Sequence, residues 1–183
     1  VAEKYGLTID QPSALKNYIL PNENYALNLI VDYGLIIPQN IIEKPKYGSI
    51  NIHPSALPKY RGASPIQSAL MAGEKETAIS IMLIDDEMDH GPILFQEKID
   101  INNDETFPEL YGRMASRAGL LVLNILPQYI DGKIKPIPQK HDLATFTKIL
   151  NREDGKINFK EQDAEEIYNS YRGLTPWPGI YTI

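Results

Sequence analysis

The sequence predicts an α/β protein built on a doubly wound, mostly parallel sheet. Two observations predict this class: apolar runs of strand length alternate with helical segments, and polar side chains stand directly after several of the runs. In open α/β sheets, ligands bind at the carboxyl ends of the strands. Strands are expected at residues 7–9, 25–31, 48–53, 81–84 and 93–101, and helices at 38–42, 64–72, 106–125 and 164–171.

The first elements are justified by the signals at their ends. Val1–Tyr5 has the character of a last helical turn, because Gly6 supplies the left-handed residue that commonly closes a helix. The run 25–31 is largely apolar, as expected of a buried strand. Pro38 begins the next helix, and Pro65 lies in the first turn of the one after it, where a missing N–H is tolerated.

The longest helix follows Thr106. Thr106 and Glu109 have the spacing of a capping box, which satisfies free N–H groups at a helix start. An apolar stripe then marks the face that turns toward the core: Leu110, Met114, Ala118, Leu121, Val122 and Ile125. From Gly132 the pattern breaks into short pieces rich in proline and charge. We therefore divide the chain into a main domain, residues 1–135, and a connector, residues 136–183.

Two polar side chains stand at the end of one predicted strand. The segment Gly48–His53 alternates as a strand does, so Asn51 and His53 project from one face. Pro54 has no N–H and ends the strand. An amide donor and a titratable imidazole are thus expected at a strand's carboxyl end. Taken singly, a turn-capping asparagine and a structural histidine explain the pair as well, and a second motif is needed to favour a site.

That second motif is an acidic loop between two predicted strands. Three consecutive acids, residues 85–87, follow the apolar run 81–84, and Asp89 precedes a Gly-Pro break. Solvated surface charge and metal binding are alternative explanations. The loop lacks the alternating oxygen ligands and central glycine of a calcium site, which argues against a metal. A carboxylate held by this loop to meet His53 is the sharper interpretation.

Together the two motifs resemble the formyltransferase family that uses 10-formyltetrahydrofolate. That family carries an Asn-x-His-x-Ser-Leu-Leu-Pro-x-Tyr-Arg-Gly motif and a later Leu-Asp-x-Gly loop. Residues 51–62 and 88–91 follow both patterns, with departures at Ala56 and Met88, and the resemblance extends over nearly the whole chain. The matching positions are Asn51, His53, Ser55, Leu57, Pro58, Tyr60, Arg61, Gly62, Asp89 and Gly91.

The resemblance implies a Rossmann-like catalytic domain with 10-formyltetrahydrofolate as the formyl donor. Asn51 and His53 would donate hydrogen bonds to the oxyanion of the intermediate. Asp89 would orient His53 and help to carry a proton from the attacking amine to the leaving folate. The folate would be held by Leu35, Ile36, Ile37, Ser55, Ala56, Leu57, Pro58, Asp85, Glu87 and Met88.

Two later segments favour family members that formylate the amino group of initiator methionyl-tRNA. They are residues 144–157 and 171–179, of which the second also resembles formyltransferases that act on sugar nucleotides. Formyl transfer to a sugar-nucleotide amine or a purine precursor is therefore one alternative, and a non-catalytic folate-binding fragment is another. Arg61 is expected in a structural pair as readily as on a substrate, His90 in no catalytic role, and His141 in solvent.

Composition narrows the class of protein further. The 183 residues are 43% apolar and 23% charged, with no cysteine and no apolar run of membrane-spanning length. Cysteine chemistry is excluded, no membrane partner is expected, and a cytoplasmic monomer is predicted. The net charge of −6 disfavours phosphate binding, so tRNA should be bound mainly by a basic domain beyond Ile183. The family's first strands should precede Val1, which makes the chain a fragment in this interpretation.

Overall fold

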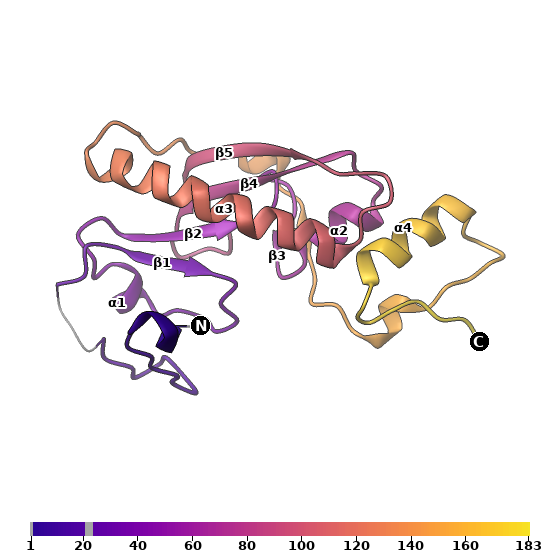
Figure 1. The fold of residues 1–183 in the computed structure, drawn as a ribbon, viewed down its shortest axis with the longest axis horizontal. Coiled ribbons are helices and arrows are strands. Elements are labelled where there is room, and N and C mark those ends of the chain that lie inside the picture. Colours follow the sequence, from indigo (N-terminus) through magenta and orange to yellow (C-terminus); the bar gives the residue numbers. More distant parts are fainter. Residues whose placement is uncertain (1, 21–23) are drawn as a thin grey trace.

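The computed structural model describes residues 2–20 and 24–183. At its centre is a four-stranded sheet in the order β1-β2-β4-β5 (Figure 1). The strands are β1 at Asn28–Val31, β2 at Ser49–His53, β4 at Glu76–Leu83 and β5 at Ile93–Asp100. β1 and β2 are parallel, whereas β4 is antiparallel to both of its neighbours, β2 and β5.

The α/β class is confirmed, but the prediction of a mostly parallel sheet is wrong for the described residues. The acidic loop joins β4 to β5 directly, and a connection that short forms an antiparallel hairpin because a parallel one needs a long crossover. The predicted strand at 7–9 is also wrong. Leu7 and Ile9 are 62% and 47% exposed, and the segment pairs with no described strand, which leaves its main chain without a ladder.

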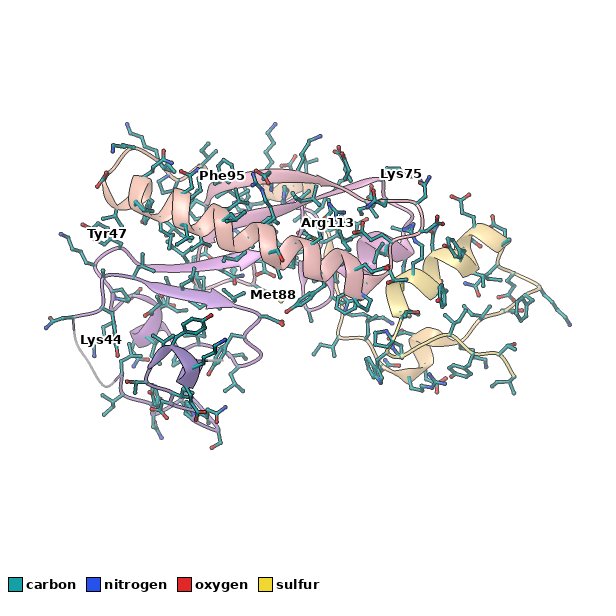
Figure 2. All side chains as sticks on the ribbon, in the orientation of Figure 1. Lys44, Tyr47, Lys75, Met88, Phe95 and Arg113 are labelled. Atoms are coloured by element: carbon teal, nitrogen blue, oxygen red, sulfur yellow. The ribbon has the colours of Figure 1, made fainter. Side chains whose placement is uncertain are left out.

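The helix α3, Phe107–Ile130, runs across one face of the sheet (Figure 1). Its capping box forms as predicted, with the N–H of Thr106 donating to Oε2 of Glu109 at 2.8 Å. The predicted stripe is confirmed as its core-facing side, since all of it is buried except Val122, which packs against the core while partly exposed. On the outer side, Arg113 (Figure 2) pairs with Glu105 at 2.7 Å.

The remaining helices are shorter and lie in two groups (Figure 1). α2, Pro65–Met71, packs against α4, Ala164–Leu174, whereas α1, Gln39–Ile42, lies beside β1 (Figure 1). Short 3-10 helices occupy Ala2–Tyr5, His141–Leu143 and Arg152–Gly155. Within residues 2–20 and 24–183, no helix combines the length and the apolar character needed to cross a membrane.

A second, two-stranded sheet joins the connector to the loop that follows β2, residues 54–62, here called the motif loop. β3, Arg61–Gly62, pairs in parallel with β6, Phe146–Thr147. The approach is so close that a Cβ atom on Gly62 would lie 2.7 Å from the carbonyl oxygen of Thr147, and the φ of Gly62 is +108°. Only glycine fits these two conditions. Residues 146–147 of the connector therefore pack directly against Arg61 and Gly62.

Candidate active site

Asn51, His53 and Asp89 form one cluster of side chains. Oδ1 of Asp89 is 3.4 Å from Nδ2 of Asn51, and its Oδ2 is 3.6 Å from Nδ1 of His53. β2 supplies the first two residues and ends at His53, while the loop between β4 and β5 supplies the third. The side chains of His53 and Asp89 are only 5% and 14% exposed, so their electrostatic interactions are weakly screened by solvent.

The orientation of His53 is set by a partner that the sequence does not predict. Its Nε2 lies 2.9 Å from the main-chain oxygen of Tyr60. A carbonyl oxygen can only accept, so Nε2 must carry a proton. When His53 is neutral, its Nδ1 therefore presents a bare lone pair to the carboxylate of Asp89. Nδ1 is thus the ring nitrogen of His53 that remains available for chemistry at this site.

Asp89 is held from two sides. Its φ of +49° lies in the left-handed region, which residues other than glycine rarely adopt. The main-chain N–H of Gly62 donates to Oδ2 at 2.7 Å. On the other side, Nε2 of Gln139 donates to the main-chain oxygen of Asp89 at 2.9 Å. Contacts from distant parts of the chain thus compensate an unfavourable backbone conformation.

The loop that carries the Tyr60 carbonyl is held in place by buried hydroxyl groups. Oγ of Ser55 donates to the main-chain oxygen of Lys59, and Oγ of Ser80 donates to that of Ser55, both at 2.6 Å. Burial and a hydrogen bond to Glu74 raise the pKa of the Tyr60 phenol to about 12. Tyr60 is therefore neutral at physiological pH, and its contact with Glu74 persists there.

The predicted folate residues 35–37 lie in the segment that follows β1. Because β1 is parallel to β2 and Val31 pairs with Ile52, the segment after β1 emerges at the same sheet edge as His53. Ile36 is 95% exposed and Leu35 is 41% exposed. Ile37 is partly buried and lines a cavity of about 380 Å³ beside β1, whose lining does not include the three clustered residues.

The predicted folate residues in the motif loop are already engaged by the protein. Ser55 and Leu57 are buried, whereas Ala56 and Pro58 are partly buried. Each of the four carbonyl oxygens from Ser55 to Pro58 accepts from a protein donor: Oγ of Ser80, N–H of Lys59, Nε2 of Gln96 and N–H of Thr145. A ligand at this loop would use the second lone pair of such a carbonyl.

The acidic loop is organised around His90. Oδ2 of Asp85 is 2.7 Å from Nδ1 of His90, and Oε1 of Glu87 is 3.9 Å from its Nε2. Met88 is 56% exposed and lies near the carboxyl ends of β1 and β2 in the view of Figure 2. In the described part of the chain, no group of three or more metal-ligating side chains is placed to hold an ion.

The structure brings Arg61, His90 and His141 together, which the sequence does not predict. Arg61 is 3% exposed, and its Nη2 lies 2.8 Å from Oε1 of Gln139 and 2.9 Å from Nδ1 of His141. The rings of His90 and His141 stack with centroids 3.9 Å apart. Arg61 thus lies in a structural pairing. His141, although exposed, has partners on its ring face and at Nδ1.

Gly91 is required by the hairpin that carries Asp89. A Cβ atom at this position would lie 2.0 Å from the carbonyl oxygen of Leu83, a contact that forces main chain against main chain. We expect Gly91→Ala in the native full-length protein to lower the free energy of unfolding by about 1–3 kcal/mol, measured by urea denaturation. Gly112→Ala is the matched control, because that helical position is open, and it should add about 0.5–1 kcal/mol. Equal stability of the two variants would contradict this account.

The chain is similar to known proteins over its whole length. The formyl transferase family matches residues 10–126, and the formyl transferase C-terminal domain matches residues 149–183. The methionyl-tRNA formyltransferase of Thermodesulfovibrio yellowstonii is 41% identical over 186 residues, covering 100% of this chain and 60% of that protein. The chain spans about three fifths of the length of the curated relatives it matches.

Solved structures are similar to the chain in fold. The methionyl-tRNA formyltransferase from Clostridium thermocellum superposes with a TM-score of 0.64 and 26% identity, covering 85% of this chain and 66% of that one. An N-formyltransferase from Helicobacter canadensis superposes with a TM-score of 0.70 and 25% identity, covering 94% and 61% of the two chains. The family match spans more than half of the chain and confirms the resemblance found in the sequence. The chain therefore belongs to the formyl transferase family.

Proposed function

We propose that the protein transfers the formyl group of 10-formyltetrahydrofolate to the amino group of methionyl-initiator tRNA, as a cytoplasmic monomer. The observation that carries the proposal is the contact of Asn51, His53 and Asp89 at the end of β2. The name of the relative that is 41% identical supports the acceptor. The folinic acid in the Helicobacter canadensis structure supports a folate donor.

In this reaction the amine nitrogen attacks the formyl carbon, the bond from that carbon to N10 breaks, and a proton moves from the amine to N10. Negative charge collects on the formyl oxygen in between. Asn51 and His53 are the donors we assign to that oxygen, and such donors are worth about 2.7–4 kcal/mol each in other enzymes. Their contacts with Asp89, at 3.4 and 3.6 Å, are too long for strong hydrogen bonds, so giving up these contacts for a substrate atom costs little.

Asp89 is the group we assign to the proton. Its Oδ2 is occupied by the N–H of Gly62 at 2.7 Å, whereas Oδ1 has only the long contact with Asn51. Oδ1 therefore has spare capacity to accept a hydrogen bond from the incoming amine. To His53, whose Nδ1 lies 3.6 Å from Oδ2 of Asp89, we assign the relay of this proton to the leaving nitrogen.

We place the folate at the sheet edge that these residues share. The exposed Leu35 and Ile36 offer apolar surface beside β2, which a pterin ring would cover. Main-chain groups of residues 55–58 and of the acidic loop, with Asp85, Glu87 and Met88, would meet its polar edge. In this arrangement residues 1–135 form the catalytic domain, and residues 136–183 lead from it toward an RNA-binding domain.

Formyl-transfer assays with the native full-length protein test the proposal. Radiolabelled formyl groups from 10-formyltetrahydrofolate should appear on methionyl-initiator tRNA and not on an amino-sugar nucleotide. The sugar acceptor is the second candidate, because the Helicobacter canadensis structure contains dTDP-3-aminofucose. Transfer to the sugar alone would replace the proposed acceptor, and the absence of transfer to either would favour a folate-binding protein without this activity.

Affinity for tRNA should depend mainly on chain outside the 183 residues. With 18 basic and 24 acidic residues, this segment can neutralise few phosphates, and counterion release makes affinity follow that number. We expect residues 1–183, shown to be folded by circular dichroism, to bind initiator tRNA much more weakly than the full-length protein in gel-shift titrations. Equal affinity with an equal salt slope would place the tRNA contacts within residues 1–183.

A further inference from the structure

We infer that Gln139 is a positioning residue that holds Asp89 in its active conformation. Gln139 comes from the connector and is only 6% exposed. Its Nε2 donates to two main-chain oxygens of the acidic loop, those of Asp89 at 2.9 Å and Gly91 at 2.8 Å. One amide therefore spans the turn that presents the Asp89 carboxylate to His53.

Arg61 fixes which way the Gln139 amide points. A guanidinium group has only donors, and Nη2 of Arg61 lies 2.8 Å from Oε1 of Gln139. The amide oxygen must therefore face Arg61, which leaves both N–H groups to face the loop. His141 accepts from the same Nη2 at 2.9 Å, so the guanidinium is itself held in place.

These contacts restrain both the side chain and the main chain of Asp89. Gly62, the neighbour of Arg61, donates to the carboxylate of Asp89, while Arg61 acts through Gln139 on its carbonyl oxygen. Of the two adjacent residues of β3, Gly62 thus holds the side chain of Asp89 directly, and Arg61 holds its main chain through Gln139. Because the φ of Asp89 is +49°, the turn would relax to a commoner conformation if one hold were lost. Such a relaxation would carry the carboxylate away from His53.

A kinetic test uses Gln139→Leu in the native full-length protein and rests on the proposed function. A displacement of the order of 1 Å can cost about 10²-fold in rate, so we expect kcat to fall about 10–100-fold with little change in KM for 10-formyltetrahydrofolate. In an Asp89→Ala background the same substitution should cause no further fall, because Gln139 acts through Asp89. Gln128→Leu is the control: that amide donates to Asn124 on the exposed side of α3, and activity should be unchanged.

A second measurement does not depend on activity. Nitrogen chemical shifts of the His53 ring report which ring atoms are protonated. They should change in Gln139→Leu in the same direction as in Asp89→Ala, and remain unchanged in Gln128→Leu. Gln139→Glu should behave like Gln139→Leu, since it keeps the shape but turns a carboxylate oxygen toward the two carbonyl groups. This isosteric variant also serves if the leucine variant does not fold.

The outcomes separate the two proposals. Unchanged His53 shifts in Gln139→Glu, or an equal loss of rate with and without the Asp89 carboxylate, would overturn the role of Gln139. A wild-type protein that transfers no formyl group would overturn the proposed function, while the chemical shifts would still decide whether Gln139 positions Asp89.

Discussion

His53→Ala is expected to lower kcat about 10²–10³-fold in the full-length enzyme while leaving KM for 10-formyltetrahydrofolate nearly unchanged. The imidazole is fixed through its Nε2 by the Tyr60 carbonyl, which leaves Nδ1 as the ring nitrogen that can serve the proposed reaction. A donor at that atom matters most when charge builds up on the formyl oxygen, so its loss should appear in turnover and not in binding. Steady-state kinetics with both substrates varied provide the measurement.

His53→Asn separates hydrogen bonding from proton transfer. The asparagine amide places a donor near the position of Nδ1 but cannot release a proton at neutral pH. A rate close to that of His53→Ala would show that the proton matters, and recovery toward wild type would show that the donor is enough. If His53→Ala raised only KM, with kcat unchanged, His53 would be a binding residue and the mechanism would be wrong.

Asp89→Asn should be as damaging, with kcat lowered about 10²–10⁴-fold, the range associated with proton transfer by a positioned side chain. The N–H of Gly62 donates to Oδ2, so the amide oxygen of the variant must stay at that position. The amide NH₂ group then replaces Oδ1 and faces the NH₂ group of Asn51, which places donor against donor. The variant can no longer accept the amine proton, and its NH₂ group opposes that of Asn51.

The control for this substitution is Asp131→Asn. Asp131 is an exposed residue at the end of α3 and pairs with Lys133. Removing its carboxylate charge should leave kcat unchanged. Single-turnover measurements with bound folate would show whether the chemical step is the one that slows. An Asp89→Asn enzyme with wild-type single-turnover rates would rule out a proton-carrying role for Asp89.

The centre of the site could be predicted because its signals are local. Alternation along residues 48–53 and the stop at Pro54 place Asn51 and His53 at a strand end, as the structure shows. The capping box of α3 and its apolar stripe are equally local. The prediction of Asp89 as a site residue also depended on the family resemblance, because an acidic loop alone is most simply explained as solvated surface charge.

The other parts of the site depend on contacts between residues far apart in the sequence, which no local pattern encodes. Gln139 lies in a polar connector without periodicity, 50 positions from the residue it holds, and the Tyr60 carbonyl that orients His53 carries no side-chain signal. The direction of β4 was missed for a different reason. The residue pattern of a strand does not show whether the strand pairs in parallel or antiparallel. Only the short connection to β5 requires β4 to be antiparallel to it.

The way Asp89 is held also bears on how this hairpin can diverge. The tip of the acidic loop, residues 86–88, is exposed, whereas Asp89 is anchored by Gly62 and Gln139, both outside the hairpin. Extra residues inserted between Asp86 and Glu87 would lengthen the tip without moving the anchored carboxylate. An insertion between Asp89 and Gly91 would instead separate the two carbonyl groups that Gln139 spans. The position of the Asp89 carboxylate is thus insensitive to the length of the hairpin before it and sensitive to the length of the hairpin after it.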